Sequence, residues 1–398
     1  MRNRLVLLLA TVSGVAVGNV YFPQSLTPAV AAGLHVSPGG AATVITAAQA
    51  GYTAGLFLLV PLGDRVPVRK LLPALLAVTG IGLLAASAAP GLPALVALSL
   101  MIGTCTVVAP IIGPFVAGLV PASRQGVTNG LLLSGGTGGM LLVRTVSGYL
   151  ASWWSWRAPY ALAGILVLTL AFLTARVLPS TVPSTRQRYP RLLGEPLRLL
   201  LRTPALRRSC LYQATIFGGF SAVWACVALL LTGPEYGYDA RAVGLLALVN
   251  AGTMIATPVA GRLVDRHGPD VVNLVCAGGV LLSAGLLAAG SLPVLVLGTL
   301  LLDMAMQSGM TANQVRIYAL SSGARSRLNT AYMTCAYSGG AAGSWLGVHC
   351  YAAFGWGGVC ALLAAVAAIP GVALLRRVRQ KARSAAPSRS ETPSVPAR

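Results

Sequence analysis

Two charged side chains, Asp303 and Arg144, lie within long apolar stretches of the sequence, where charges are otherwise scarce. Asp303 falls near the middle of the run Leu292 to Tyr318, and Arg144 falls late in the run Val127 to Trp153. If these runs cross a bilayer, a charge there costs about 3 kcal/mol or more unless it faces protein or a water-filled cavity. Both side chains are therefore candidates for binding a ligand, and Asp303 is also a candidate for carrying a proton.

Asp303 shares one face of its predicted helix with other polar side chains. These side chains follow one another at helical steps of three, four and seven residues, so they lie on the same face as Asp303. They are Thr299, Gln307, Met310 and Gln314. A carboxyl group in that position could bind and release a proton as a substrate leaves and returns. The alternative is a carboxylate held by structural hydrogen bonds or by an ion pair.

Arg144 cannot lose its proton, so at that depth it must meet an anion, a cluster of carbonyl groups or water. It could pair with Asp303, bind an anionic group of a substrate, or lock two halves of the protein together. The sequence leaves these three roles open. Arg316 lies on roughly the opposite face of its helix from Asp303, near the helix end, and is expected to snorkel or to contact a loop.

Other polar and aromatic side chains inside apolar runs are weaker candidates to line a cavity. They are Asn19, Gln24, Gln49, Tyr52, Gln213, Trp224, Asn250, Tyr332 and Tyr337. Buried amides and tyrosines also join helices to one another, so some of these residues are expected to be structural. The glycine-rich runs Gly135 to Gly139 and Ser338 to Gly343 predict close helix packing rather than phosphate loops.

The composition requires a bilayer around these residues. Mean hydropathy is +0.76, and only 9% of the 398 residues are charged, against about 25% in soluble proteins. Continuously apolar runs of about 20 residues predict membrane helices rather than barrel strands. Twelve are predicted: 5–31, 41–62, 71–89, 92–120, 127–153, 160–178, 209–231, 243–260, 271–289, 292–318, 328–352 and 359–375.

The first half of the chain is repeated by the second. Asp64-Arg65 recurs as Asp265-Arg266, at an offset of 201 residues (265 − 64). Such a parallel repeat predicts a two-lobed carrier. We expect an N-terminal lobe over residues 1–178, a cytoplasmic linker over 179–208, a C-terminal lobe over 209–375 and a disordered basic tail over 376–398.

The net charge of +21 is concentrated in alternate connections, and only Arg157 and Arg241 fall in the opposite set. The positive-inside rule therefore places both termini and the central linker in the cytoplasm. Within that linker, residues 191–202 could form an amphipathic helix on the membrane surface. The basic segments are expected to be topology signals near anionic lipid, and no nucleic-acid partner is predicted.

Motifs in the connections point to a known family. Gly261, Asp265-Arg266 and Gly268 match the hallmark loop of the major facilitator superfamily, and Asp64-Arg65 with Arg69-Lys70 is a degenerate first copy. The chain resembles this superfamily over nearly its whole length. The segments NVYFPQ (19–24), RTVSG (144–148) and ARSRLNTAYM (324–333) resemble a bacterial subgroup near the multidrug and metabolite efflux carriers.

The resemblance implies an all-α membrane protein of twelve helices in two six-helix lobes around a central cavity. It also implies a gating role for the loop residues Asp64, Arg65, Arg69, Asp265 and Arg266, which would latch the outward-facing state. Two features depart from drug:proton antiporters of the family. The fourth span carries no arginine, and the glycine-proline motif of the fifth span is interrupted by Met140 and by Val143-Arg144.

From these patterns we expect a proton-coupled secondary transporter of the bacterial inner membrane that exports a small organic molecule. Uptake of a metabolite and a non-transporting membrane receptor or sensor are the alternatives. An enzyme is not expected, because no nucleophile-base or paired-carboxylate constellation occurs within the spans. The seven cysteines and three histidines lack metal-ligand spacing, so no metal or cofactor is expected. We expect a monomer whose partners are substrate, protons and lipid.

Overall fold

The computed structural model describes residues 3–117, 122–179, 188–250, 252–253, 256–320 and 325–385. In these residues the chain is helical and has no strand. The N-terminal half contains α1 (Asn3–Tyr21), α2 (Pro23–Leu34), α3 (Pro38–Leu58), η1 (Val60–Asp64), α4 (Val68–Ser87), α5 (Leu92–Cys105), α6 (Ala109–Ala117), α7 (Ala122–Trp153) and α8 (Arg157–Val177).

A short helix, α9 (Tyr189–Arg202), joins this half to the next. The C-terminal half contains α10 (Pro204–Thr232), α11 (Ala240–Asn250), α12 (Ala256–His267), α13 (Pro269–Leu287), α14 (Leu292–Leu320) and α15 (Arg325–Ala385). Within the described residues, nine helical stretches are long and apolar enough to cross a membrane. The all-helical membrane fold is thus confirmed, while the number of twelve crossings stays a prediction.

Several predicted spans are broken into two helices. Span one is interrupted at Phe22 and span four between α5 and α6. A proline stands in the first turn after each break, Pro23 in α2 and Pro110 in α6. Proline has no N–H to continue the preceding helix but fits the first turn of the next. In α15, Gly355 has φ 62° and ψ −157°, so the two last predicted spans meet at a non-helical glycine.

The connecting segments differ in detail from the expectation. Residues 204–208, expected in the linker, already belong to α10. Residues 376–385 continue α15 as a helix, and residues 386–398 lie outside the described part of the chain, so the expected disorder of the tail stays a prediction. The amphipathic segment of the linker is helical, as α9. The lobe boundaries themselves stay a prediction.

The glycine-rich runs pack helices closely, as predicted. A Cβ on Gly139 of α7 would collide with the backbone of Gly14 on α1, and a Cβ on Gly343 of α15 would collide with the backbone of Gly218 on α10. The offset is the same for both partners, 204 residues (218 − 14 and 343 − 139). The same backbone contact therefore occurs once in each half, as the sequence repeat implies.

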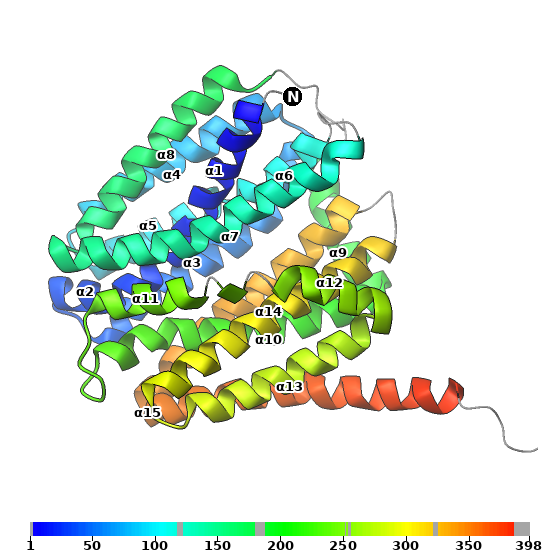
Figure 1. Ribbon diagram of the computed structural model, residues 1–398. Helices are drawn as coiled ribbons and strands as arrows, with labels where there is room; N and C mark the ends of the chain where they lie inside the picture. Colours follow the sequence, from blue (N-terminus) through cyan, green and yellow to red (C-terminus); the bar gives the residue numbers. More distant parts are fainter. Residues whose placement is uncertain are drawn as a thin grey trace, which may run out of the picture.

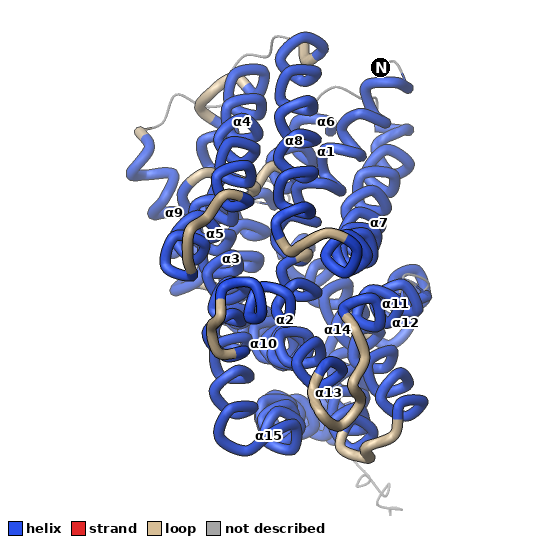
Figure 2. Tube along the Cα trace, turned by 90° about the vertical axis from the view of Figure 1, so that its left-hand side faces the viewer, coloured by secondary structure: helices blue, strands red, loops and turns tan. Residues whose placement is uncertain are grey.

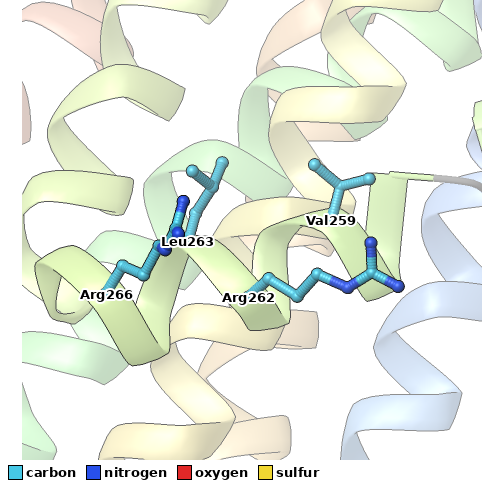
Figure 3. Close-up of a pocket in the computed structure, with 4 residues that line it drawn as sticks. All are labelled: Val259, Arg262, Leu263 and Arg266. Carbon is cyan, nitrogen blue, oxygen red and sulfur yellow. The ribbon is translucent and has the colours of Figure 1, made fainter.

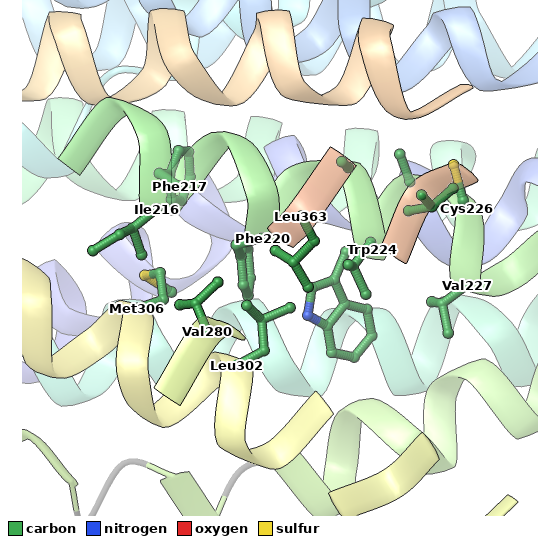
Figure 4. Close-up of a cluster of buried hydrophobic side chains, with 14 of the residues drawn as sticks. Ile216, Phe217, Phe220, Trp224, Cys226, Val227, Val280, Leu302, Met306 and Leu363 are labelled. Carbon is green, nitrogen blue, oxygen red and sulfur yellow. The ribbon is translucent and has the colours of Figure 1, made fainter. Parts of the chain in front are cut away.

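The two halves of the chain pack against each other, and one buried cluster contains residues of both. Figures 1 and 2 both place α1 and α4–α8 above and α10 and α13–α15 below, with α2 and α11 between them. A buried apolar cluster between Leu9 and Leu178 belongs wholly to the N-terminal half. A second buried cluster surrounds α10 (Figure 4). Every residue of α10 from Ile216 to Leu231 is buried. Helix α10 is therefore enclosed by its own half and by the other.

We call the end that carries η1, α9 and the end of α12 the basic end, and the other end the opposite end. The connections α2–α3, α7–α8 and α10–α11 lie together at the opposite end, on the left of Figure 1. Hydrogen bonds that join the halves directly lie in the middle or towards this end. Among the described residues they include Tyr21–Tyr337 (3.1 Å), Thr46–Ser344 (3.2 Å), Thr145–Gly244 (2.9 Å) and Arg241–Ser152 (2.9 Å).

At the basic end, helix α9 supplies contacts to both halves. The Tyr189 hydroxyl donates to the carbonyl of Leu58 on α3, and burial raises the pKa of Tyr189. Glu195 forms an ion pair with Arg327 of α15 at 2.8 Å. The linker helix therefore bridges the halves at one end, while their helices touch directly at the other.

Candidate functional site

Arg144 of α7 is completely buried at the boundary between the halves. Its Nη2 donates to Oε1 of Gln24 on α2 at 2.5 Å, whereas its Nε and Nη1 have no hydrogen-bond partner among the described residues. The guanidinium carbon lies 4.2 Å from the ring centroid of Trp224 on α10 and 5.1 Å from that of Tyr21 on α1. Arg144 is thus stabilised mainly by aromatic faces, one of them from the other half.

Asp303 of α14 is also buried, at 3% exposure. The indole Nε1 of Trp224 donates to its Oδ1 at 3.0 Å. The ion pairs found among the described residues do not include Asp303 or Arg144, although the two charges attract each other. One indole therefore contacts both buried charges, through its N–H on one side and its face on the other.

A hydrogen-bond cluster fixes the backbone at Arg144. Ser25 of α2 donates to the Arg144 carbonyl at 3.1 Å, and its hydroxyl lies 2.9 Å from that of Ser147. Ser147 also lies within hydrogen-bond distance of the Arg144 carbonyl, at 3.0 Å. Because Ser25 follows the break at Phe22 closely, the kink between α1 and α2 brings it to α7. The position of Arg144 is therefore fixed in two ways: Ser25 and Ser147 hold its backbone carbonyl, and Gln24 accepts a hydrogen bond from its guanidinium.

Aromatic side chains extend the site between the halves. The Tyr21 hydroxyl lies 3.1 Å from that of Tyr337 on α15. The Tyr337 ring centroid lies 4.5 Å from that of Tyr52 on α3 and 4.8 Å from that of Phe217 on α10. Tyr52 and Tyr337 were candidates from the sequence. Tyr21 was missed, although it stands between the candidates Asn19 and Gln24 in the NVYFPQ segment.

The remaining predicted cavity residues fall into two groups. Gln49 and Gln213 are almost completely buried, and neither side-chain amide has a hydrogen-bond partner among the described residues; Gln24 keeps its Nε2 unpaired. In contrast, Asn19 donates to Thr106 at 3.3 Å within the N-terminal half. Thr299 accepts from Asn250 at 3.3 Å within the C-terminal half, and Gln307 and Gln314 are half-buried on α14.

The predicted gating residues lie at the basic end. Asp64 ends η1 and is half-buried, while Arg65 and Arg69 are exposed. Arg266 is exposed on α12, and the side chain of Asp265 lies outside the described part of the structure. Their gating role stays a prediction.

A surface pocket of about 560 Å³ on α12 is lined by Val259, Arg262, Leu263 and Arg266 (Figure 3). All four side chains are exposed. The pocket contains neither Arg144 nor Asp303, so it is separate from the buried charges between the halves.

Arg316 does not snorkel to solvent. It is 8% exposed and forms an ion pair with Asp270, in the first turn of α13. Its guanidinium carbon also lies 6.0 Å from the ring centroid of Tyr212 on α10. The expectation of snorkelling was therefore wrong, because a partner from the neighbouring helix neutralises the charge inside the C-terminal half.

The family of the chain follows from comparison with known proteins. The model of the Major Facilitator Superfamily matches residues 7–255 and 214–398, and the chain belongs to this superfamily of membrane transporters. The resemblance stated from the loop motifs is thus confirmed.

Three relatives are informative. The "Uncharacterized transporter YgaY" of Escherichia coli O157:H7 is 33% identical over 92% of this chain and 93% of its own length. The "Probable transporter SCO4007" of Streptomyces coelicolor is 35% identical over 90% and 84%. The "Chloramphenicol resistance protein" of Streptomyces lividans is 30% identical over 70% and 71%.

Solved structures share the fold. The nucleoside transporter NupG gives a TM-score of 0.72 at 12% identity, covering 95% of this chain and 100% of that one. A bacterial homologue of the human lysosomal transporter Spinster, in an inward-facing and occupied conformation, gives 0.67 at 14% identity, covering 96% and 95%. At these identities the likeness describes the fold alone.

Proposed function

We propose that this protein exports a small organic molecule from the bacterial cytoplasm in exchange for protons, by alternating access between its halves. The observation that carries the proposal is the contact of one indole, Trp224, with buried charges from both halves, Arg144 and Asp303. A group that binds between them touches both halves at once. Its arrival or departure can therefore change which arrangement of the halves is more stable.

The contacts between the halves support a state that is closed on one side. If the basic end faces the cytoplasm, as the positive-inside rule favours, the bonds Thr46–Ser344 and Thr145–Gly244 close the outer side. Transport then requires these bonds to break while new contacts form at the basic end. The exposed arginines Arg65, Arg69 and Arg266 are placed at that end to form them.

Asp303 is the proposed proton carrier. It is an acidic side chain buried close to the boundary with the other half, and its carboxylate has a single strong donor, the Trp224 N–H, among the described hydrogen bonds. Protonation removes its negative charge and with it the attraction to Arg144 across the boundary. A substrate that needs the ionised carboxylate would compete with the proton, which is the requirement for exchange.

We propose the direction of transport from the name of a homologous protein. The Streptomyces lividans relative is named for chloramphenicol resistance. We extend export, but not that substrate, to this chain. Uptake would be the conclusion if expression of the wild type makes the host in the growth test below more sensitive to a compound instead of resistant to it.

The test is growth of a drug-hypersensitive bacterial host that expresses the wild type, Asp303→Asn or Glu235→Gln, across antibiotics, dyes and metabolites. Glu235 is exposed in the loop after α10, so its variant is a matched carboxyl-to-amide control. We expect resistance with the wild type and the control, and its loss with Asp303→Asn at equal membrane expression. Resistance that persists in Asp303→Asn would make Asp303 structural.

A second measurement addresses the coupling directly. Inside-out vesicles supplied with the exported compound in fluorescent or radiolabelled form should accumulate it when a proton gradient is imposed, and should lose it when the gradient is collapsed. Accumulation that ignores the gradient would contradict proton exchange.

A further inference from the structure

The indole ring of Trp224 contacts both buried charges of the site. Its N–H donates to Asp303 Oδ1 at 3.0 Å, and its face covers the Arg144 guanidinium at 4.2 Å. The ring is completely buried and packs beside Phe220, with ring centroids 6.3 Å apart (Figure 4). Within the described residues, the space between the two charges is thus filled by an aromatic ring that carries a hydrogen-bond donor.

The donors around Arg144 are nevertheless incompletely matched. Nε and Nη1 of Arg144 and Nε2 of Gln24 are buried and have no acceptor among the described residues. Buried donors without acceptors are unfavourable, especially on a charged group. An additional acceptor atom beside the guanidinium would therefore be stabilising, and the described part of the chain does not supply one.

We propose that the Trp224 ring holds the place of a substrate, and that the substrate is a neutral aromatic compound with an N–H or O–H donor. This inference rests on the proposed function, because it assigns the substrate class of the same site. The donor binds the Asp303 carboxylate and the ring stacks on the guanidinium. An acceptor group, where the compound carries one, meets the unpaired nitrogens of Arg144.

Charge balance selects the neutral class. Arg144 and ionised Asp303 together carry no net charge, so a ligand with a single charge is attracted by one of them and repelled by the other, whereas a neutral ligand is repelled by neither. The charged and titratable groups that interact with Asp303 among the described residues are Arg144 and Tyr21. Arg144 is already counted in this balance, and Tyr21 adds no charge to it because a tyrosine is neutral near pH 7.

The same geometry explains competition with the proton. An ionised carboxylate accepts a strong hydrogen bond from an N–H or O–H group, whereas a protonated carboxyl group accepts more weakly and needs an acceptor for its own proton. Substrate binding is therefore strongest when Asp303 is ionised. A proton that binds to Asp303 favours substrate release.

The test uses indole and 1-methylindole, which differ by the ring N–H, with the purified full-length protein in detergent. Binding is measured by displacement of radiolabelled indole. We expect 1-methylindole to bind about tenfold more weakly or worse, the cost of losing a hydrogen bond to a charged acceptor. Indole-3-carboxylate and tryptamine, which add a negative and a positive charge, should also bind more weakly than indole.

A variant supplies a second readout that does not depend on transport. Indole binding to the wild type should weaken as the pH falls through the titration of Asp303, and Asp303→Asn should bind without this pH dependence. The control Glu235→Gln should behave as the wild type. Monodisperse elution of each variant establishes that it is folded.

The outcomes separate this inference from the proposed function. Equal affinities for indole and 1-methylindole, tighter binding of a charged analogue, or no saturable binding of indole at millimolar concentration would each overturn the substrate class. Export that depends on Asp303 could stand in all three cases. Donor-selective, pH-dependent binding without export in cells would support the substrate class and contradict the proposed function.

Discussion

Arg144 and Trp224 meet across the boundary between the halves, with the guanidinium carbon 4.2 Å from the ring centroid. Both side chains are completely buried. A cation held over an indole face away from water is stabilised by about 2 kcal/mol. Because the residues come from α7 and α10, this attraction holds the halves together in the observed state.

Replacing Trp224 separates the role of its ring face from that of its N–H. Trp224→Phe keeps a face for Arg144 but removes the donor to Asp303, and Trp224→Leu removes both. We expect a loss of thermal stability in the order wild type, Phe, Leu, with about 1.5–3 kcal/mol for the hydrogen bond to the charged carboxylate. Thermal unfolding in detergent measures the order. Trp154→Phe, at a position 78% exposed, is the control and should change little.

The glycine contact between α1 and α7 should be intolerant of a methyl group. Gly139→Ala places a Cβ against the backbone of Gly14, which cannot move without displacing the helix. We expect a loss of folded protein, or a destabilisation of about 1–3 kcal/mol, the range for overpacking. Gly138→Ala is the matched control, since a Cβ there meets nothing within 4 Å. Size-exclusion profiles and thermal unfolding of both variants would compare them; equal profiles would contradict the contact.

The buried ion pair between Arg316 and Asp270 predicts a large effect of removing one partner. Arg316→Gln removes the guanidinium that pairs with Asp270, in a site where the two side chains are 8% and 14% exposed. We expect a destabilisation of about 3–5 kcal/mol, because removing one partner of a largely buried ion pair is strongly unfavourable. The double variant with Asp270→Asn should recover part of the loss. Both effects are measured by thermal unfolding.

An exposed pair provides the contrast. Arg327 and Glu195 are 43% and 26% exposed, and Arg327→Gln should cost no more than about 1 kcal/mol. A cost as large as that of Arg316→Gln would show that α9 depends on this contact far more than its exposure implies.

A disulfide between α3 and α15 should hold the two halves in the observed arrangement. The hydroxyls of Thr46 and Ser344 lie 3.2 Å apart, so cysteines at these positions should form a disulfide under mild oxidation. We expect the cross-link to stop transport, since it holds the halves in one arrangement, and a reducing agent to restore it. The wild type, with its seven native cysteines, is the control for background oxidation. Full transport by the cross-linked protein would contradict alternating access at this boundary.

The order of residues along the chain determined much of this architecture. Apolar runs of membrane length predicted the helices, the repeat of Asp64-Arg65 as Asp265-Arg266 predicted two halves, and the glycine runs predicted where helices touch. Asp303 and Arg144 were identifiable because a charge inside an apolar run is evident without knowing its neighbours. The same local signals did not predict that α15 continues as a helix over residues 376–385.

Only the tertiary structure decided what these residues contact. Helical periodicity tells which face a side chain occupies but not which helix covers that face. The bond between Trp224 and Asp303 joins residues 79 positions apart, and Tyr21 meets Tyr337 across 316 positions. Such contacts depend on how the halves pack. The sequence by itself therefore placed two charges inside the membrane, and the packing of α7, α10 and α14 placed one indole against both.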